Sequence, residues 1–116
     1  MNIIIHRGTH QIGGSAIEIS TASTRIMLDF GNVLSLNEKY TPINININID
    51  GVTEGTVDCD GIVISHYHMD HLGQLTAALP EIPLYMGVLS KEVAMIAAEH
   101  QDKNLYLRLL GANTFH

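Results

Sequence analysis

A strand-like run that ends in a cluster of polar side chains constrains this chain more than any other feature. Residues 61–65 have the apolar, β-branched character of a buried strand. His66, His68, Asp70 and His71 follow within the next six residues, and imidazole and carboxylate groups are the usual protein ligands of zinc and related divalent ions. Layered α/β proteins place their sites at such strand ends, where a rigid sheet holds the loops. We therefore predict a layered α/β fold with a metal site here.

The spacing of the four side chains predicts more than one ion. His66 and His68 are two residues apart, so on an extended segment they project to the same side and can chelate one ion. Asp70 and His71 lie where the chain turns into a helix, and they can face a second ion. Two ions about 3.5–4 Å apart can share a bridging water and stabilise negative charge that develops during hydrolysis. The cluster therefore indicates a hydrolytic metal centre.

The rest of the chain predicts strands first and then alternating strands and helices. Period-2 and apolar patterns predict strands over residues 3–7, 16–20, 25–30, 59–65 and 82–86. A short helix is predicted over 72–79, before Pro80, and a long one from near Ser90 to about Leu110. The apolar stripe of the long helix is expected to comprise Leu89, Val93, Ile96 and His100, with His100 a buried core histidine. This order is typical of half of a mixed α/β sandwich.

Two features of the sequence are expected to have no chemical role. Residues 43–49 alternate Ile and Asn, which predicts either an edge strand or an association-prone insert. His6, His10 and His116 are expected to bind no metal, and Asp102 is expected to be a solvated charge on the long helix.

Composition narrows the class of protein. The 116 residues amount to one domain or part of one, with 46% hydrophobic and 16% charged residues. No apolar run approaches the roughly 20 residues that span a bilayer, so no membrane segment is predicted. The formal charge of −6, with only six Lys and Arg, makes this segment by itself a poor nucleic-acid surface. A single cysteine, Cys59, is typical of a reducing, cytoplasmic setting.

Residues 63–73, which contain the pattern H-x-H-x-D-H, resemble the metal-binding strand–loop–helix of the metallo-β-lactamase-fold hydrolases. The resemblance implies that His66 and His68 bind one ion, and that Asp70 and His71 bind the other. It implies a catalytic role for Asp70, which orients the attacking water. Residues 28–31 are similar to the family's upstream segment, so Asp29 is implied to accept a hydrogen bond behind a ligating histidine. Two zinc ions are the implied cofactors, and manganese or iron is compatible with the same ligands.

The glycine-rich start of the chain narrows the resemblance. Gly8-Thr9 and Gly13-Gly14-Ser15 resemble the ribonuclease J or β-CASP branch of the superfamily, which implies RNA or another phosphodiester as substrate. The histidine motif is shared with thioesterases and lactonases, so hydrolysis of a thioester or lactone is the alternative within the fold.

The resemblance also implies an incomplete domain. Complete family members add a histidine, a bridging aspartate and a late histidine downstream, and nothing after His71 matches these. We therefore expect residues 1–116 to form the N-terminal half of an αββα sandwich, a mixed sheet with helices on one face. The isolated chain is expected to bind metal weakly or as a single ion, with little turnover. A homodimer or swapped arrangement would complete the sheet. A non-catalytic metal-binding or assembly module is the alternative for the chain alone.

Overall fold

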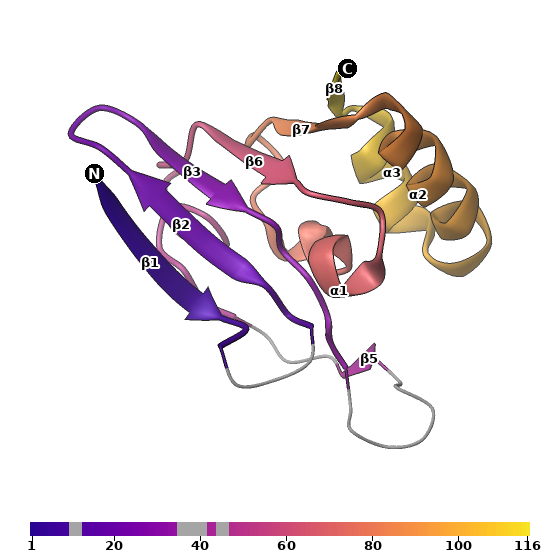
Figure 1. Ribbon diagram of the computed structural model, residues 1–116, viewed down its shortest axis with the longest axis horizontal. Coiled ribbons are helices and arrows are strands. Elements are labelled where there is room, and N and C mark those ends of the chain that lie inside the picture. The colour runs from indigo at the N-terminus through magenta and orange to yellow at the C-terminus, as the bar shows by residue number, and fades with distance from the viewer. Residues whose placement is uncertain (10–12, 35–41, 44–46) are drawn as a thin grey trace.

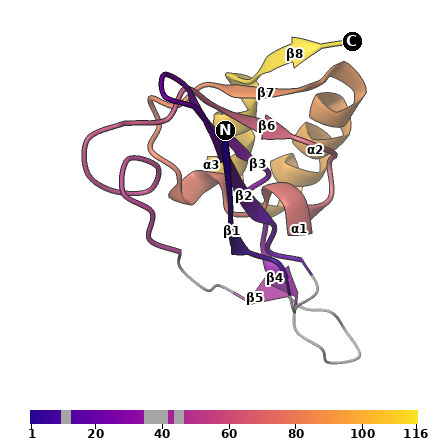
Figure 2. The same ribbon diagram turned by 60° about the vertical axis from the view of Figure 1, so that its left-hand side comes forward.

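A single mixed sheet organises the computed structural model, which describes residues 1–9, 13–34, 42–43 and 47–116 (Figure 1). Its strands lie in the order β1-β2-β3-β6-β7-β8. They are β1 (Asn2–Arg7), β2 (Ala16–Ser20), β3 (Arg25–Leu28), β6 (Gly61–Ile64), β7 (Leu84–Gly87) and β8 (Asn113–Phe115). The first three strands are antiparallel, whereas β3, β6, β7 and β8 are parallel neighbours. Two short strands, β4 (Val33–Leu34) and β5 (Pro42–Ile43), pair apart from the main sheet (Figure 2).

The helices lie in the connections between the parallel strands. These are α1 (Met69–Leu72), the 3₁₀ helix η1 (Leu75–Ala77), α2 (Val88–Gln101) and α3 (Lys103–Leu110). The connections β6 to β7 and β7 to β8 run in the same direction across the sheet. Because such crossovers are right-handed, they place their helices on one face of the sheet.

Alternate residues of the parallel strands form the core. Ile62, Ile64, Leu84 and Met86 are buried, whereas the intervening Tyr85 is exposed. The helices contribute buried residues at helical spacing, namely Ala94 and Ala98 from α2 and Leu105 and Leu109 from α3. The core therefore lies between one face of the sheet and the helices, as a period of 2 in strands and 3.6 in helices requires.

The other face of the sheet is also apolar. Ile3 and Ile5 of β1 pair directly with Ile19 and Ile17 of β2, so these side chains share one face. Ile3 is 61% exposed and Ile5 is 53% exposed. A mixed sheet with helices on one face and an apolar second face is the partial sandwich that the sequence predicted. Within the described residues nothing supports the expected dimer or swapped completion.

The long predicted helix is two helices, and Asp102 is the reason. The Asp102 side chain accepts hydrogen bonds from the backbone N–H groups of Asn104 and Leu105, both at 3.1 Å. Asp102 has extended backbone dihedrals and is the N-cap of α3. The prediction that Asp102 is only a solvated charge on a continuous helix was therefore wrong.

The predicted buried stripe of α2 was also wrong. Leu89 is 75% exposed, Ile96 is 65% exposed, and His100 is exposed rather than in the core. The buried positions are Ala94 and Ala98. Apolar residues occur on more than one side of α2, and small side chains let a helix approach the layer beneath it closely. Hydrophobic spacing alone could not choose between the two faces.

Other helices and strands begin or end a few residues away from their predicted bounds. The short helix begins at Met69 rather than 72 and gives way to η1. The third strand ends at Leu28 because Asp29 adopts a left-handed φ of 61°. In the Ile/Asn run, Ile43 belongs to β5, residues 44–46 lie outside the described residues, and 47–49 form no strand. His10 also lies outside the described residues.

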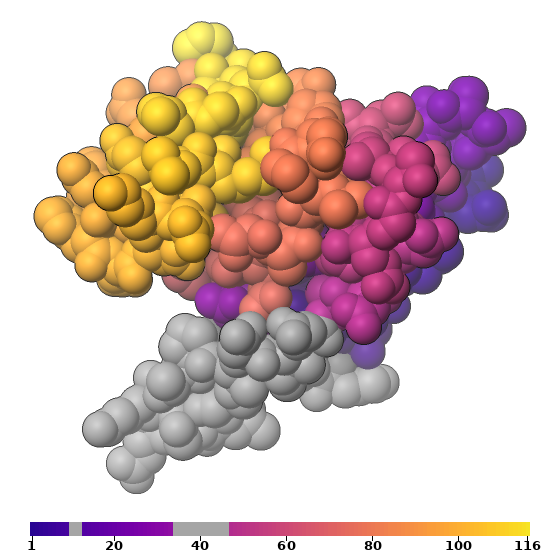
Figure 3. All heavy atoms as spheres, turned by 180° about the vertical axis from the view of Figure 1, so that it is seen from behind, coloured from indigo at the N-terminus to yellow at the C-terminus, as the bar shows by residue number. Residues whose placement is uncertain are grey.

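Three segments cover the back of the molecule side by side. In Figure 3 these are α3 in yellow, residues 75–84 in orange and residues 47–60 in magenta. The Arg108 guanidinium donates to the carbonyls of Leu79 and Ile82, at 3.2 and 2.7 Å, and the Leu79 N–H donates to the Val52 carbonyl at 2.7 Å. No helix in the described part of the chain has the length and apolar character needed to cross a bilayer.

Candidate metal centre

The candidate centre forms where β3 and β6 end side by side. The two strands are parallel, and Leu28 lies opposite Val63. The next residue of each strand therefore reaches the same edge of the sheet, and the Asp29 N–H continues the ladder to the Val63 carbonyl at 2.9 Å. Asp29 and the segment that starts at Ser65 are thus brought together from positions 36 residues apart.

Asp29 is the buried acceptor at this edge. Its side chain is 6% exposed, and its left-handed backbone turns the carboxylate towards the loop after β6, a conformation that Asp adopts more readily than most residues. Oδ1 accepts from the Ser65 N–H at 2.7 Å, and Oδ2 lies 2.7 Å from His71 Nδ1. This is the contact that the sequence predicted for Asp29 behind a ligating histidine. Its role in metal binding stays a prediction.

Three of the four predicted ligands come together. His66, Asp70 and His71 can each offer one ligand atom, and these atoms lie within 4.8 Å of one another. His71 Nε2 is 3.3 Å from Asp70 Oδ2, and the His66 and His71 rings have centroids 3.8 Å apart. Two imidazoles and a carboxylate are a donor set that suits a divalent ion, with three protein ligands as in catalytic zinc sites.

His68 lies beside this group but not in it. It is exposed and is the N-cap residue of α1, and its ring centroid is 4.8 Å from that of His66. The chain bends at Tyr67 and His68, so the two histidines are not on one extended segment as predicted. The pairing of His66 with His68 at one ion, and of Asp70 with His71 at another, stays a prediction.

The short helix α1, which carries Asp70 and His71, is docked onto residues 30–32. The Phe30 N–H donates to the His71 carbonyl at 2.7 Å, and the Asn32 N–H donates to the Met69 carbonyl at 2.9 Å. The buried Gln74 side chain donates to Asn32 Oδ1 at 2.9 Å. A Cβ on Gly31 would lie 1.7 Å from the Asp70 carbonyl oxygen, so only glycine permits this approach. No local pattern in the sequence marks Asn32 or Gln74, because the two residues that contact each other are 42 positions apart.

An arginine ties the glycine-rich start of the chain to the same edge. The Arg7 guanidinium donates to the Gly14 carbonyl at 3.0 Å and to the Gly31 carbonyl at 2.7 Å. Burial lowers the pKa of Arg7 from its usual range. The Gly13-Gly14-Ser15 segment is thereby held against residues 31 and 32, next to the candidate centre.

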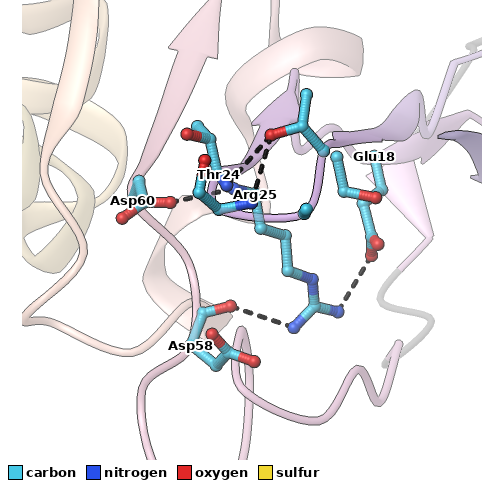
Figure 4. A pocket seen from close by; sticks show the side chains of 9 residues that line it. Glu18, Thr24, Arg25, Asp58 and Asp60 are labelled. Carbon is cyan, nitrogen blue, oxygen red and sulfur yellow. Dashed lines mark hydrogen bonds and ion pairs between the residues drawn. The ribbon is translucent and has the colours of Figure 1, made fainter. Parts of the chain in front are cut away.

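A second polar cluster lies away from the centre and has a structural role (Figure 4). The Arg25 guanidinium donates to Glu18 Oε1 at 2.9 Å and to the carbonyls of Asp50 and Asp58 at 2.9 and 3.0 Å. His6 Nε2 lies 3.0 Å from Glu18 Oε1. Hydrogen bonding from Arg25 lowers the pKa of Glu18, and the same contact raises the pKa of Arg25. Arg25 therefore fastens the 50–58 segment to β2 and β3.

The fold is a partial sandwich with a histidine–aspartate cluster at its strand ends, and the sequence is similar to those of known proteins. No protein-family model matches the chain. The chain is 30% identical to "Probable RNase MJ4" of Methanocaldococcus jannaschii, over 89% of this chain and 23% of that protein. It is 32% identical to "RNase aCSPSF2" of Saccharolobus solfataricus, over 90% of this chain and 19% of that protein. It is 31% identical to "Integrator complex subunit 11" of Gallus gallus, over 79% and 16% respectively.

Solved structures share the fold. A crystal structure of a protein of unknown function from Enterococcus faecalis V583 matches with a TM-score of 0.65 at 18% identity. The match covers 97% of this chain and 32% of that one.

Over most of its length the chain is thus similar, at about 30% identity, to proteins of the metallo-β-lactamase fold in the β-CASP branch, as its motif predicted. It spans about a fifth of the length of these curated relatives.

Proposed function

We propose that this chain provides the first metal-binding segment of a metal-dependent hydrolase that cleaves RNA at a phosphodiester bond. The convergence of His66, Asp70 and His71 at the end of β6 is the observation that carries the proposal. Two of the relatives are named as RNases, which supports RNA as the substrate class. The whole protein's activity is part of this proposal, since the comparisons cover only a fraction of each relative.

The residues fit a metal, and their roles follow from their contacts. His66, Asp70 and His71 would hold an ion, and His68, beside His66, would join them after a small side-chain movement. A bound divalent ion supplies Lewis acidity, which favours hydroxide over water near neutral pH and offsets charge on phosphate oxygens. Asp29 would hold the His71 ring, because its carboxylate contacts Nδ1 and leaves Nε2 to face Asp70. Asp70 would also orient the attacking water.

We propose zinc as the ion, because histidine with carboxylate is a common zinc ligand set, and manganese or iron would also be compatible. The isolated 116-residue chain is expected to bind weakly or to hold one ion, with little turnover. A cytoplasmic location is supported by the single cysteine, Cys59, which is buried and whose pKa burial raises.

The test compares wild-type protein with the Asp70→Asn variant, both produced as the whole polypeptide that the gene encodes. A labelled single-stranded RNA, a thioester and a lactone are offered to each with zinc or manganese. We expect cleavage of the RNA, a loss of activity of at least about 100-fold in Asp70→Asn, and loss on chelation. Hydrolysis of the thioester or lactone without RNA cleavage would replace this proposal by the alternative substrate class. Metal binding without hydrolysis of any of the three would favour a non-catalytic module.

A further inference from the structure

Ser65, the residue between β6 and the histidine cluster, lies at the centre of a hydrogen-bond network. Its hydroxyl Oγ lies 2.7 Å from Asp29 Oδ2, 3.0 Å from His66 Nδ1 and 3.4 Å from His71 Nδ1. Its backbone N–H donates to Asp29 Oδ1 at 2.7 Å, so the residue is fixed to Asp29 by both its backbone and its side chain.

The number of available protons determines the direction of each bond. An ionised carboxylate only accepts, so the single Ser65 hydroxyl proton must go to Asp29 Oδ2, at the shortest of the hydroxyl's three contacts. Oγ then has only lone pairs left for the imidazoles. His66 can contact it only as a donor, which requires the proton of the neutral ring to be on Nδ1. His71 donates its own Nδ1 proton directly to Asp29 Oδ2, at 2.7 Å.

We infer that Ser65 is a positioning residue, through which Asp29 orients the ring of His66 in addition to that of His71. Asp29 fixes the tautomer of His71 directly and that of His66 through the Ser65 hydroxyl. Both rings then carry hydrogen on Nδ1 and present the Nε2 lone pair for metal binding. The inference rests on the proposed metal site, but the tautomer itself is a property of the metal-free protein.

The test uses an isosteric pair, because Thr and Val have the same shape and differ by the hydroxyl. Ser65→Thr keeps the hydroxyl and Ser65→Val removes it, and both β-branched residues suit the end of a strand. Ser65→Ala serves as a second hydroxyl-free variant if the valine variant does not fold. Ring ¹⁵N spectra of the metal-free protein are recorded at about pH 8, above the usual histidine pKa of ~6.5. Zinc affinity is measured separately by competition with a chromophoric chelator.

We expect His66 to carry its proton on Nδ1 in wild type and Ser65→Thr, and to lose that preference in the hydroxyl-free variants. His71 is the internal reference, since its direct bond to Asp29 keeps its tautomer unchanged in every variant. Zinc affinity should fall about 10- to 100-fold without the hydroxyl and recover in Ser65→Thr. An unchanged His66 tautomer in Ser65→Val or Ser65→Ala would overturn the inference, as would failure of threonine to restore it.

The two proposals fail separately. A tautomer change without RNA cleavage by the whole protein would remove the proposed substrate and leave the role of Ser65 intact. RNA cleavage by the whole protein, with an unchanged His66 tautomer in the hydroxyl-free variants, would overturn the role of Ser65 and leave the proposed substrate intact.

Discussion

At the scale of single residues, the candidate centre depends on how closely backbone segments approach one another. Gly31 faces the first turn of α1, where an added Cβ would lie 1.7 Å from the Asp70 carbonyl oxygen and 2.6 Å from the His71 nitrogen. Both neighbours are backbone atoms and cannot rotate away. Any side chain at position 31 therefore has to displace the helix that carries two proposed ligands.

Gly31→Ala should lower the free energy of unfolding by about 1–3 kcal/mol or more, as overpacking does. It should also weaken zinc binding by about tenfold or more, because Asp70 and His71 move together. Denaturant unfolding and chelator competition measure the two effects. Gly87→Ala is the matched control, since a Cβ there meets nothing closer than Ser90 Oγ at 3.7 Å. Equal effects of the two substitutions would show that the close approach of α1 does not exclude a side chain at position 31.

At the scale of elements, the 50–58 segment is fastened to β2 and β3 by the ion pair of Arg25 with Glu18. Glu18 is only 7% exposed in its side chain, so solvent screens this pair weakly. Arg25 lowers the pKa of Glu18 in the folded state. A lowered carboxyl pKa adds stability above the unfolded-state value of about 4.3 and loses it as pH falls through the folded-state value.

Glu18→Gln should therefore cost about 1–3 kcal/mol at pH 7, because the Arg25 guanidinium loses its charged partner. The difference from wild type should shrink as the pH falls below the unfolded-state value of about 4.3 and through the lowered pKa of Glu18 in the folded state, because wild-type Glu18 then becomes protonated. Urea unfolding at several pH values measures this. Glu92→Gln, at an exposed position of α2, is the control and should show little difference at any pH. A Glu18→Gln difference independent of pH would contradict the role assigned to the ion pair.

At the scale of the whole molecule, the sheet has one covered face and one apolar face that is much more open. Ile62 is fully buried against the helices, whereas Ile3 is 61% exposed on the second face. The same substitution at the two positions should therefore differ in its effect on the unfolding of the isolated chain.

Ile62→Ala should lower the free energy of unfolding by about 2–5 kcal/mol, because it removes buried surface and leaves a cavity. Ile3→Ala should change it by less than about 1 kcal/mol. Denaturant titrations at two protein concentrations measure both values. A large, concentration-dependent loss in Ile3→Ala would show that a second chain covers this face.

Local patterns in the sequence were enough to predict the kind of fold and the place of the candidate centre. Apolar alternation marked β2, β3, β6 and β7, and the histidine cluster after β6 identified the strand end and the family, because these signals are local in the chain. Tertiary structure alone decided which face of α2 is buried, since its apolar residues lie on more than one side and Ala94 and Ala98 pack inward. It also decided that Asp102 divides the long helix.

At the candidate centre, too, the sequence predicted the residues and the tertiary structure decided their arrangement. The sequence predicted His66, His68, Asp70 and His71 as ligands and Asp29 behind them. The structure groups three of these proposed ligands and leaves His68 beside them. The contacts of Ser65, Gly31 and Gln74 depend on segments 36 to 42 residues apart. Such contacts exist only once parallel β3 and β6 lie side by side, and no local pattern in the chain encodes them.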